Sequence, residues 1–147
     1  FIGLAQELRG APLTFPTPRG GNHPLWTVGH VALSEAEMMR IAFGGDDPLA
    51  DWEPIFGRTS EPTDDAAAYP PFDEVVNRFR EVRARTLRLL EETGEEGLSR
   101  APHEKMEGVG HWSDSVGGVF HLAVVHMMSH HGQLADARRA LGMGPRF

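Results

Sequence analysis

The sequence predicts an all-α protein, and three observations support this fold class. The chain has 147 residues, the usual size of one domain. Apolar residues recur at helical spacing in four segments, and no segment shows sustained strand alternation or an Asn-Gly or Asp-Gly hairpin turn. The composition, with 40% hydrophobic and 24% charged residues, is that of an ordinary globular domain. We therefore expect residues 1–147 to form a single domain, a bundle of four helices.

The first two helices are indicated by apolar spacing and by residues that start and stop helices. Residues 1–8 already show helical spacing, so we interpret them as part of a longer helix. The second helix is expected to begin near His23-Pro24, with Asn22 as its cap, and to end at Gly44-Gly45. Two apolar stripes run along this second helix, which is typical of a central helix that contacts two neighbours.

The third helix is expected to run from Pro70-Pro71 to Gly94, and the fourth from Ser113–Ser115 to Gly142. Within the fourth, residues 116–135 contain no Asp, Glu, Lys or Arg and match the length of a membrane span. Four histidines in the same stretch are a polar load that hydrocarbon tolerates poorly. We interpret this segment as a buried helix of a soluble bundle, with no membrane partner. Because no secretory signal is seen, a cytoplasmic location is the default expectation.

The second and third helices are joined by an unusually long connection. This crossover, Gly44–Pro70, spans 27 residues, whereas helix connections in bundles usually have about 2 to 8. Such a length lets the third helix run parallel to the second. Trp52, Ile55 and Phe56 give the crossover an apolar anchor of its own, with which it can cover one end of the bundle.

The charge and the lack of cysteine limit the chemistry. The formal charge is −7, and seven of the acidic residues lie in the crossover with only Arg58 to offset them. An acidic chain does not favour nucleic acid, whose phosphates need clustered Lys and Arg. If the crossover borders a binding pocket, its charge disfavours anionic substrates. With no cysteine, any metal must be held by nitrogen and oxygen atoms.

Three histidines are candidates for those nitrogen atoms. His126 and His130 lie one turn apart on one face of the fourth helix, among apolar neighbours, where two imidazoles can share a metal ion. The alternative is that both are core histidines that hydrogen-bond to the backbone or to each other, which explains the same spacing. His30 lies on an apolar stripe of the second helix and can face this pair. Three histidines with open coordination positions are typical of catalytic rather than structural metal sites.

The same residues carry a family resemblance. The run Asn22-His-Pro-Leu-Trp26-Thr-Val-Gly-His30-Val-Ala-Leu-Ser-Glu35, followed by His126-x-x-x-His130-His131-Gly132-Gln133 and Arg138-Arg139-x-Leu-Gly142, resembles the DinB/YfiT-like superfamily. The resemblance implies a four-helix bundle of up-down-down-up topology with a long crossover between helices 2 and 3. It also implies a divalent metal ion, commonly zinc or nickel, on His30, His126 and His130. Members of the family are often dimers, so a homodimer is expected.

The resemblance leaves the reaction open. Characterised relatives include S-transferases that use the thiols bacillithiol or mycothiol, a mycothiol-dependent isomerase, and proteins described as hydrolases. The first hypothesis is therefore a metal-dependent transferase that joins a low-molecular-weight thiol to a small electrophile. The second is a hydrolase in which the metal activates a water molecule. The third is a stress-response module that binds metal or ligand without turnover.

Two further residues are candidates for supporting roles. Glu37 lies two turns after His30 on the same stripe, where it can accept a proton, orient a ligand or pair with an arginine of another helix. Gln133 shares the face of His126 and His130, where it can hydrogen-bond a ligand imidazole or simply satisfy the backbone. Neither residue is identified by its match to the family as a catalytic base.

Overall fold

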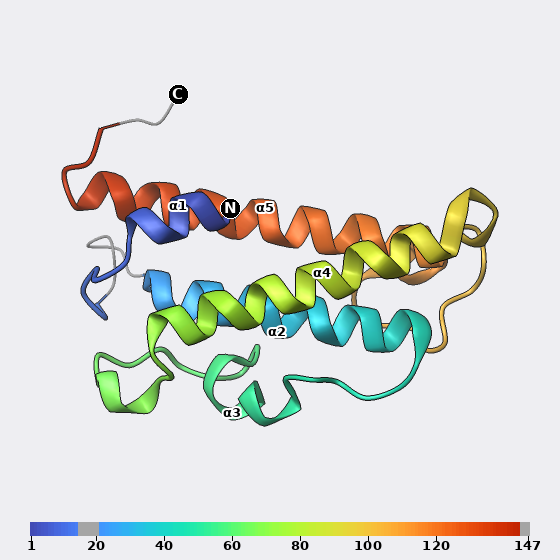
Figure 1. Cartoon of the computed structure of the whole chain (residues 1–147), viewed down its shortest axis with the longest axis horizontal. Coiled ribbons are helices and arrows are strands. Elements are labelled where there is room, and N and C mark those ends of the chain that lie inside the picture. The colour runs from blue at the N-terminus through green and yellow to red at the C-terminus, as the bar shows by residue number, and fades with distance from the viewer. Residues whose placement is uncertain (15–20, 145–147) are drawn as a thin grey trace.

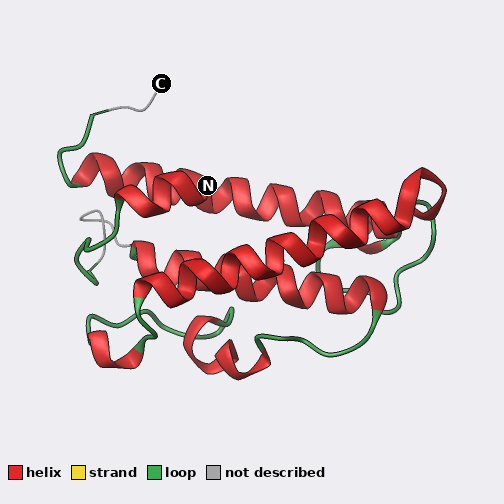
Figure 2. Ribbon diagram, viewed as in Figure 1, coloured by secondary structure: helices red, strands yellow, loops and turns green. Residues whose placement is uncertain are grey.

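The fold is all-helical, as the sequence predicts. The computed structural model describes residues 1–14 and 21–144, and within these residues it contains helices and no strand (Figure 2). The α-helices are α1 (Ile2–Glu7), α2 (Pro24–Phe43), α3 (Glu53–Phe56), α4 (Phe72–Gly97) and α5 (Val116–Ala140). Single 3-10 turns lie at Ala50–Trp52, Ala66–Ala68 and Gly110–Ser113.

The long helices lie side by side along the molecule, with α2 in contact with all the others. In Figure 1, α2 and α4 run in the same direction, while α1 and α5 run the opposite way. The crossover therefore brings the chain back along the molecule, as its length predicted. α2 packs on α1, α3, α4 and α5, which agrees with the two apolar stripes read from its sequence.

The start of α2 is capped by His23, one residue later than the predicted cap Asn22. The buried His23 ring accepts the Trp26 amide N–H at Nδ1 over 3.1 Å, so the neutral ring carries its proton on Nε2. That nitrogen lies 3.2 Å from the Tyr69 hydroxyl, which also accepts the Thr63 amide N–H at 2.8 Å. The His23 imidazole therefore takes the place of the expected Asn22 amide as the cap. Its second nitrogen also contacts Tyr69, near the end of the crossover.

The crossover folds along the side of α2 rather than over one end of the bundle. As predicted, Trp52 and Phe56 are buried and Ile55 packs against the core. The Phe56 ring lies against the backbone of α2 at Gly29, where a Cβ atom would overlap the ring. The expected end cover was wrong because Gly29 offers the aromatic anchor a site on the side of α2, in the first half of that helix (Figure 1).

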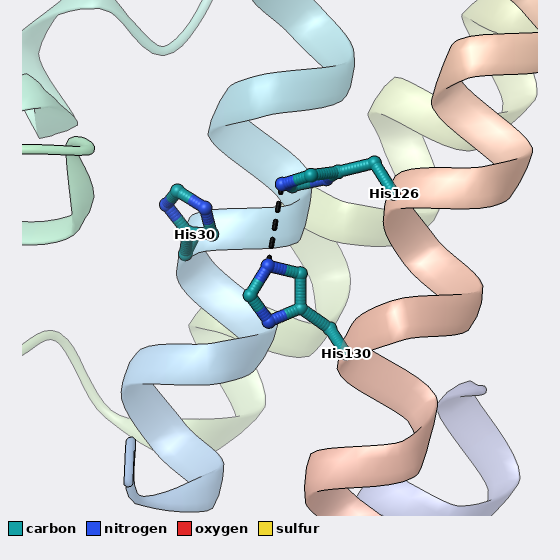
Figure 3. A group of neighbouring side chains, drawn as sticks. All are labelled: His30, His126 and His130. Atoms are coloured by element: carbon teal, nitrogen blue, oxygen red, sulfur yellow. Dashed lines mark hydrogen bonds between the residues drawn. The ribbon is translucent and has the colours of Figure 1, made fainter.

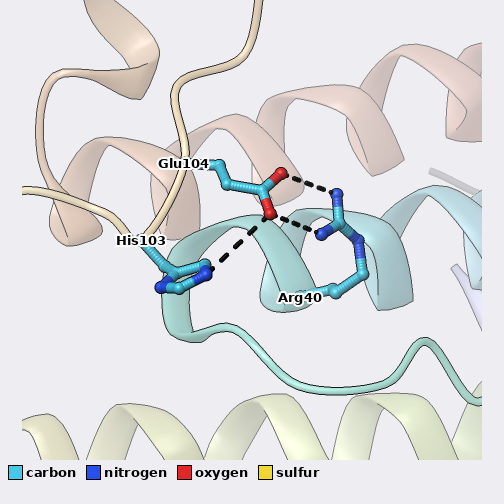
Figure 4. A network of polar contacts seen from close by, with 3 residues as sticks. All are labelled: Arg40, His103 and Glu104. Atoms are coloured by element: carbon cyan, nitrogen blue, oxygen red, sulfur yellow. Dashed lines mark hydrogen bonds and ion pairs between the residues drawn. The ribbon is translucent and has the colours of Figure 1, made fainter.

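The third predicted helix corresponds to α4, which extends beyond its expected end. Gly94 has φ 58° and ψ 176°, so it interrupts the helix, and a last turn continues to Gly97. The connection between α4 and α5 is hydrogen-bonded to the end of α2 (Figure 4). His103 and Glu104 donate their amide N–H groups to the Ala42 and Ile41 carbonyls, and the Glu104 carboxylate accepts two hydrogen bonds from Arg40.

α5 is less buried than the sequence suggested. Ser115 caps its start by accepting the Gly118 amide N–H at 3.1 Å, within the predicted range. One side of the helix packs on α2, but Val124 and Met128 are 45% and 55% exposed. The segment without charged residues thus forms an apolar outer face of α5 as well as part of the core. Within the described residues, no helix has the length and apolar character required to cross a membrane.

Candidate metal centre

His30, His126 and His130 come together between α2 and α5 (Figure 3). One ring nitrogen from each residue lies within 4.8 Å of the other two. His30 is buried at 8% exposure, and the two histidines of α5 are half-buried. The structure therefore unites the three residues that the sequence singled out.

The pair on α5 is arranged by the helix and by one amide side chain. The Nε2 atoms of His126 and His130 lie 3.2 Å apart. His130 Nδ1 lies 2.9 Å from Gln133 Oε1, and because an amide oxygen only accepts hydrogen bonds, Nδ1 carries the proton. In the neutral ring, Nε2 of His130 then carries the lone pair and accepts a hydrogen bond from His126 Nε2. Of its two expected roles, Gln133 thus takes that of hydrogen-bonding a candidate ligand imidazole, and its side chain is exposed rather than buried.

His30 is held by the crossover. Its Nδ1 donates a hydrogen bond of 2.7 Å to the Phe56 carbonyl, which leaves the lone pair on Nε2. The Trp26 ring stacks on the imidazole, with centroids 4.6 Å apart and planes inclined by 10°. Trp26 in turn donates its ring N–H to the Ile55 carbonyl and the Ser60 hydroxyl, each at 3.0 Å. The crossover thereby fixes both the proton and the plane of the His30 ring.

The surroundings keep the three imidazoles neutral. Burial lowers the pKa of His30, His126 and His130 below its ordinary value. For His126, burial and then the two neighbouring histidines lower the pKa to about 4. A neutral imidazole is the form that binds a metal ion, and protonation would place like charges side by side.

The donor set fits a divalent metal ion. Zinc and nickel both bind imidazole nitrogen, and histidine ligands usually donate their other ring N–H to an oxygen acceptor. His30 and His130 each meet that second condition, through a carbonyl and an amide oxygen respectively. Within the described residues the group has three members and no fourth protein ligand, which leaves room for an exogenous group.

A pocket of about 630 Å³ opens beside the cluster, and His30 and His126 line it. One wall belongs to α2 and the crossover, and another to residues 105–109 in the connection between α4 and α5. The charged lining residues are Glu37, Glu53, Arg58, Lys105 and Glu107, and the apolar ones include Leu33, Ile41, Val109 and Leu122. The crossover therefore does border the site, as the charge argument anticipated.

A family model described as the DinB superfamily matches residues 1–134. The chain belongs to the DinB superfamily. Searches of curated proteins and of solved structures returned no match. The superfamily is metal-binding, and all three histidines lie within the matched range, whereas Arg138, Arg139 and Gly142 lie beyond it.

Glu37 lies in the pocket of this DinB-superfamily chain, two turns along α2 from His30. Burial raises the pKa of Glu37, and the carboxylates of Glu53 and Asp47 raise it further. No ion pair joins Glu37 to an arginine of another helix among the residues the structure describes. The buried acid of α2 is instead Glu35, whose Oε2 accepts a hydrogen bond of 2.6 Å from Arg83.

Several parts of the DinB-superfamily site were not identified from the sequence. The Phe56 carbonyl is a backbone group, which no residue pattern reveals. Arg58 and residues 105–109 reach the pocket only through the fold of two long connections. The glycines Gly108 and Gly110, both with positive φ, were the available signal that the second connection makes tight turns.

Proposed function

We propose that this chain is a metal-dependent transferase that joins a low-molecular-weight thiol to a small electrophile. The divalent ion, zinc or nickel, is held by His30, His126 and His130. The observation that carries the proposal is that two of these histidines line a pocket of about 630 Å³, a size suited to small molecules. The chain has no cysteine, so the reacting sulfur belongs to a separate molecule.

Each part of the site has a role in this proposal. The bound ion supplies a positive charge that favours the thiolate form of a thiol at neutral pH. The Phe56 carbonyl and Gln133 keep His30 and His130 in the tautomer that carries the lone pair on Nε2. The walls formed by the crossover and by residues 105–109 hold the two reactants close together and reduce the water around them.

The test combines metal analysis with a reaction screen. Protein purified without a histidine tag is expected to carry one zinc or nickel ion per chain by elemental analysis. It is expected to accelerate conjugation for at least one pair in a panel of small thiols and electrophiles. His126→Ala should lose both metal and activity. His121→Ala, an exposed histidine of α5 whose ring packs on Trp112, should keep both.

A hydrolase remains the second candidate, and Glu37 is the observation that favours it. A carboxylate with a raised pKa in the pocket is suited to accept a proton from water. This function predicts turnover without thiol and a loss of about 10²- to 10⁴-fold in rate for Glu37→Gln. Metal binding with no turnover in either screen would favour a non-catalytic binding module.

We also interpret the helix directions in Figure 1 as the up-down-down-up bundle expected for the family. In this interpretation α1 and α5 are the first and last helices of the order and run antiparallel to α2 and α4, which the crossover joins as a parallel pair. The arrangement places His30 and the α5 histidines on facing helices, as is usual for metal sites in bundle cores.

A further inference from the structure

The charged side chains of one pocket wall lack partners within the protein. Glu37, Glu53 and Arg58 all line the wall formed by α2 and the crossover. In the described part of the chain, none of the three side chains makes a hydrogen bond or an ion pair within 4 Å. By contrast, Lys105 on the other wall donates to Asp114 at 3.1 Å. The first wall thus presents one cation and two anions that are free to contact a ligand.

These charges nevertheless lie close enough to influence one another. Glu53 raises the pKa of Glu37, and Arg58 lowers it. A ligand with only a negative charge would meet Arg58 but also the carboxylates of Glu37, Glu53 and Glu107. A ligand with only a positive charge would meet these carboxylates but also Arg58. A ligand with both charges can offer each group an opposite partner at the same time.

We propose that the small molecule bound beside the three histidines is a zwitterion of the amino-acid type. Its carboxylate lies on Arg58, and its ammonium group lies between Glu37 and Glu53. The inference rests on the proposed function, because it names the substrate class of the same pocket. The apolar lining of Leu33, Ile41 and Leu122 contacts the uncharged part of the molecule.

The position of Arg58 in the chain brings such a ligand to the metal centre. Arg58 follows Phe56 by two residues, and the Phe56 carbonyl orients His30. Both residues therefore belong to the short segment that packs on α2. An arginine also suits this role chemically, because its planar guanidinium can donate two parallel hydrogen bonds to one carboxylate.

Three probes that lack a free thiol test the positive and the negative charge of the ligand separately. They are S-methyl-L-cysteine, which carries both charges, 2-(methylthio)ethylamine, which carries only the positive one, and 3-(methylthio)propanoate, which carries only the negative one. Binding to the zinc-loaded full chain is measured by calorimetry. S-methyl-L-cysteine is expected to bind at least about tenfold more tightly than either other probe, because it gains one further charge-assisted hydrogen-bonded contact.

Matched variants assign each charge to its partner. Arg58→Met should weaken S-methyl-L-cysteine and 3-(methylthio)propanoate by about tenfold and leave 2-(methylthio)ethylamine unchanged. Glu53→Gln should weaken the two probes that carry an ammonium group. Arg88→Met and Glu92→Gln, on an exposed part of α4 outside the pocket, should change none of the affinities. Circular dichroism and zinc content establish that each variant is folded and loaded.

The inference is overturned if S-methyl-L-cysteine does not bind, if the three probes bind equally, or if Arg58→Met leaves all affinities unchanged. Its failure can be told apart from that of the proposed function. Thiol transfer that runs equally well with cysteine and 2-mercaptoethanol, and is unaffected in Arg58→Met, supports the transferase and rejects the zwitterion. If S-methyl-L-cysteine binding depends on Arg58 but no thiol is transferred to any electrophile, the zwitterion is supported and the transferase is rejected.

Discussion

His30 and His130 are each held by a hydrogen bond at Nδ1, and each acceptor is different in kind. For His30 the acceptor is a backbone carbonyl of the crossover, and for His130 it is the side chain of Gln133 on the same helix. A side-chain acceptor can be removed by mutation, whereas a carbonyl can only be moved. The two histidines therefore call for different experiments.

Removal of the Gln133 amide is expected to weaken metal binding. Without an acceptor at Nδ1, His130 is no longer held in the tautomer that carries the lone pair on Nε2, so Gln133→Ala should lower zinc affinity by about 10- to 100-fold. Competition with a chromophoric chelator measures this affinity. Gln6→Ala, at an exposed position of α1, is the matched control. Equal affinities in the two variants would contradict the role of Gln133.

Zinc affinity is also expected to depend on pH in a defined direction. Protons and the metal compete for the same lone pairs, and burial lowers the pKa of all three histidines below about 6.5. Affinity should therefore stay constant between about pH 8 and 6.5 and fall at lower pH, where the rings become protonated. The chelator titration repeated across this range measures the change. An affinity that does not fall by about pH 4, where His126 becomes protonated, would speak against three histidine ligands.

At the level of elements, the contact between α2 and the crossover controls His30. Gly29 leaves the backbone of α2 bare, and the Phe56 ring occupies that space. The Phe56 carbonyl then reaches His30, one residue further along α2. A glycine inside a helix usually weakens it, so its presence here is explained by the close approach of the ring.

Gly29→Ala is expected to displace Phe56. Overpacking of this kind costs about 1 to 3 kcal/mol of the free energy of unfolding, and the shift of the Phe56 carbonyl should also weaken zinc binding. Gly132→Ala on α5, where a new Cβ meets open space, should instead stabilise the fold by about 0.5 to 1 kcal/mol. Urea unfolding of the two variants checks the opposite signs. If both variants are more stable than the wild type, the packing argument fails.

A second link between elements is the ion pair of Glu35 with Arg83. Glu35 is only 2% exposed, and its Oε1 has no hydrogen-bond partner among the described residues. Arg83 also contacts the sulfur atom of Met127, the neighbour of His126. The pair therefore joins α2 and α4 close to the ligands on α5.

Arg83→Met is expected to leave the Glu35 charge buried and unpaired. Burial already raises the pKa of Glu35 despite Arg83, and loss of the cation raises it further. Because the folded state then holds the proton more tightly than the unfolded state, stability is retained at pH 4 and lost as the pH rises. Urea unfolding at pH 8 should show a loss of about 3 to 5 kcal/mol. A loss that is equal at both pH values would contradict this explanation.

At the level of the whole molecule, large apolar side chains are exposed on the two longest helices. They are Leu87 and Leu90 on α4 and Val124, Val125 and Met128 on α5. Clusters of exposed apolar residues often mark association sites. The homodimer expected from the family resemblance has a candidate interface at the exposed apolar residues of α5.

Met128→Glu is expected to shift the chain from dimer to monomer, because a carboxylate would be buried in this interface without a partner. Light scattering coupled to size-exclusion chromatography measures the mass of each form. Leu141→Glu, at a 45% exposed position beyond the end of α5, is the control. A wild-type chain that is monomeric at micromolar concentration would reject the interface and the dimer together.

The sequence predicted the features that depend on neighbours along the chain. Helix ends followed from glycine, proline and serine signals, and the His126–His130 pair from a spacing of one turn. Partners set by tertiary packing were not predictable in this way. Arg83 of α4 pairs with Glu35 of α2, because the fold decides which acid lies near that arginine. For the same reason Arg58 and residues 105–109 were assigned no role until the connections were placed around the pocket.

The division of the site between helices and connections has a consequence for how it can diversify. The three histidines are carried by α2 and α5, whose packing fixes the core, while much of the pocket wall is carried by two surface connections. Surface connections tolerate insertion, deletion and exchange better than packed helices do. New substrate preferences can therefore arise by replacing residues 57–59 or 105–109 while the metal-binding scaffold stays intact. A library confined to these two segments is a compact starting point for redesign.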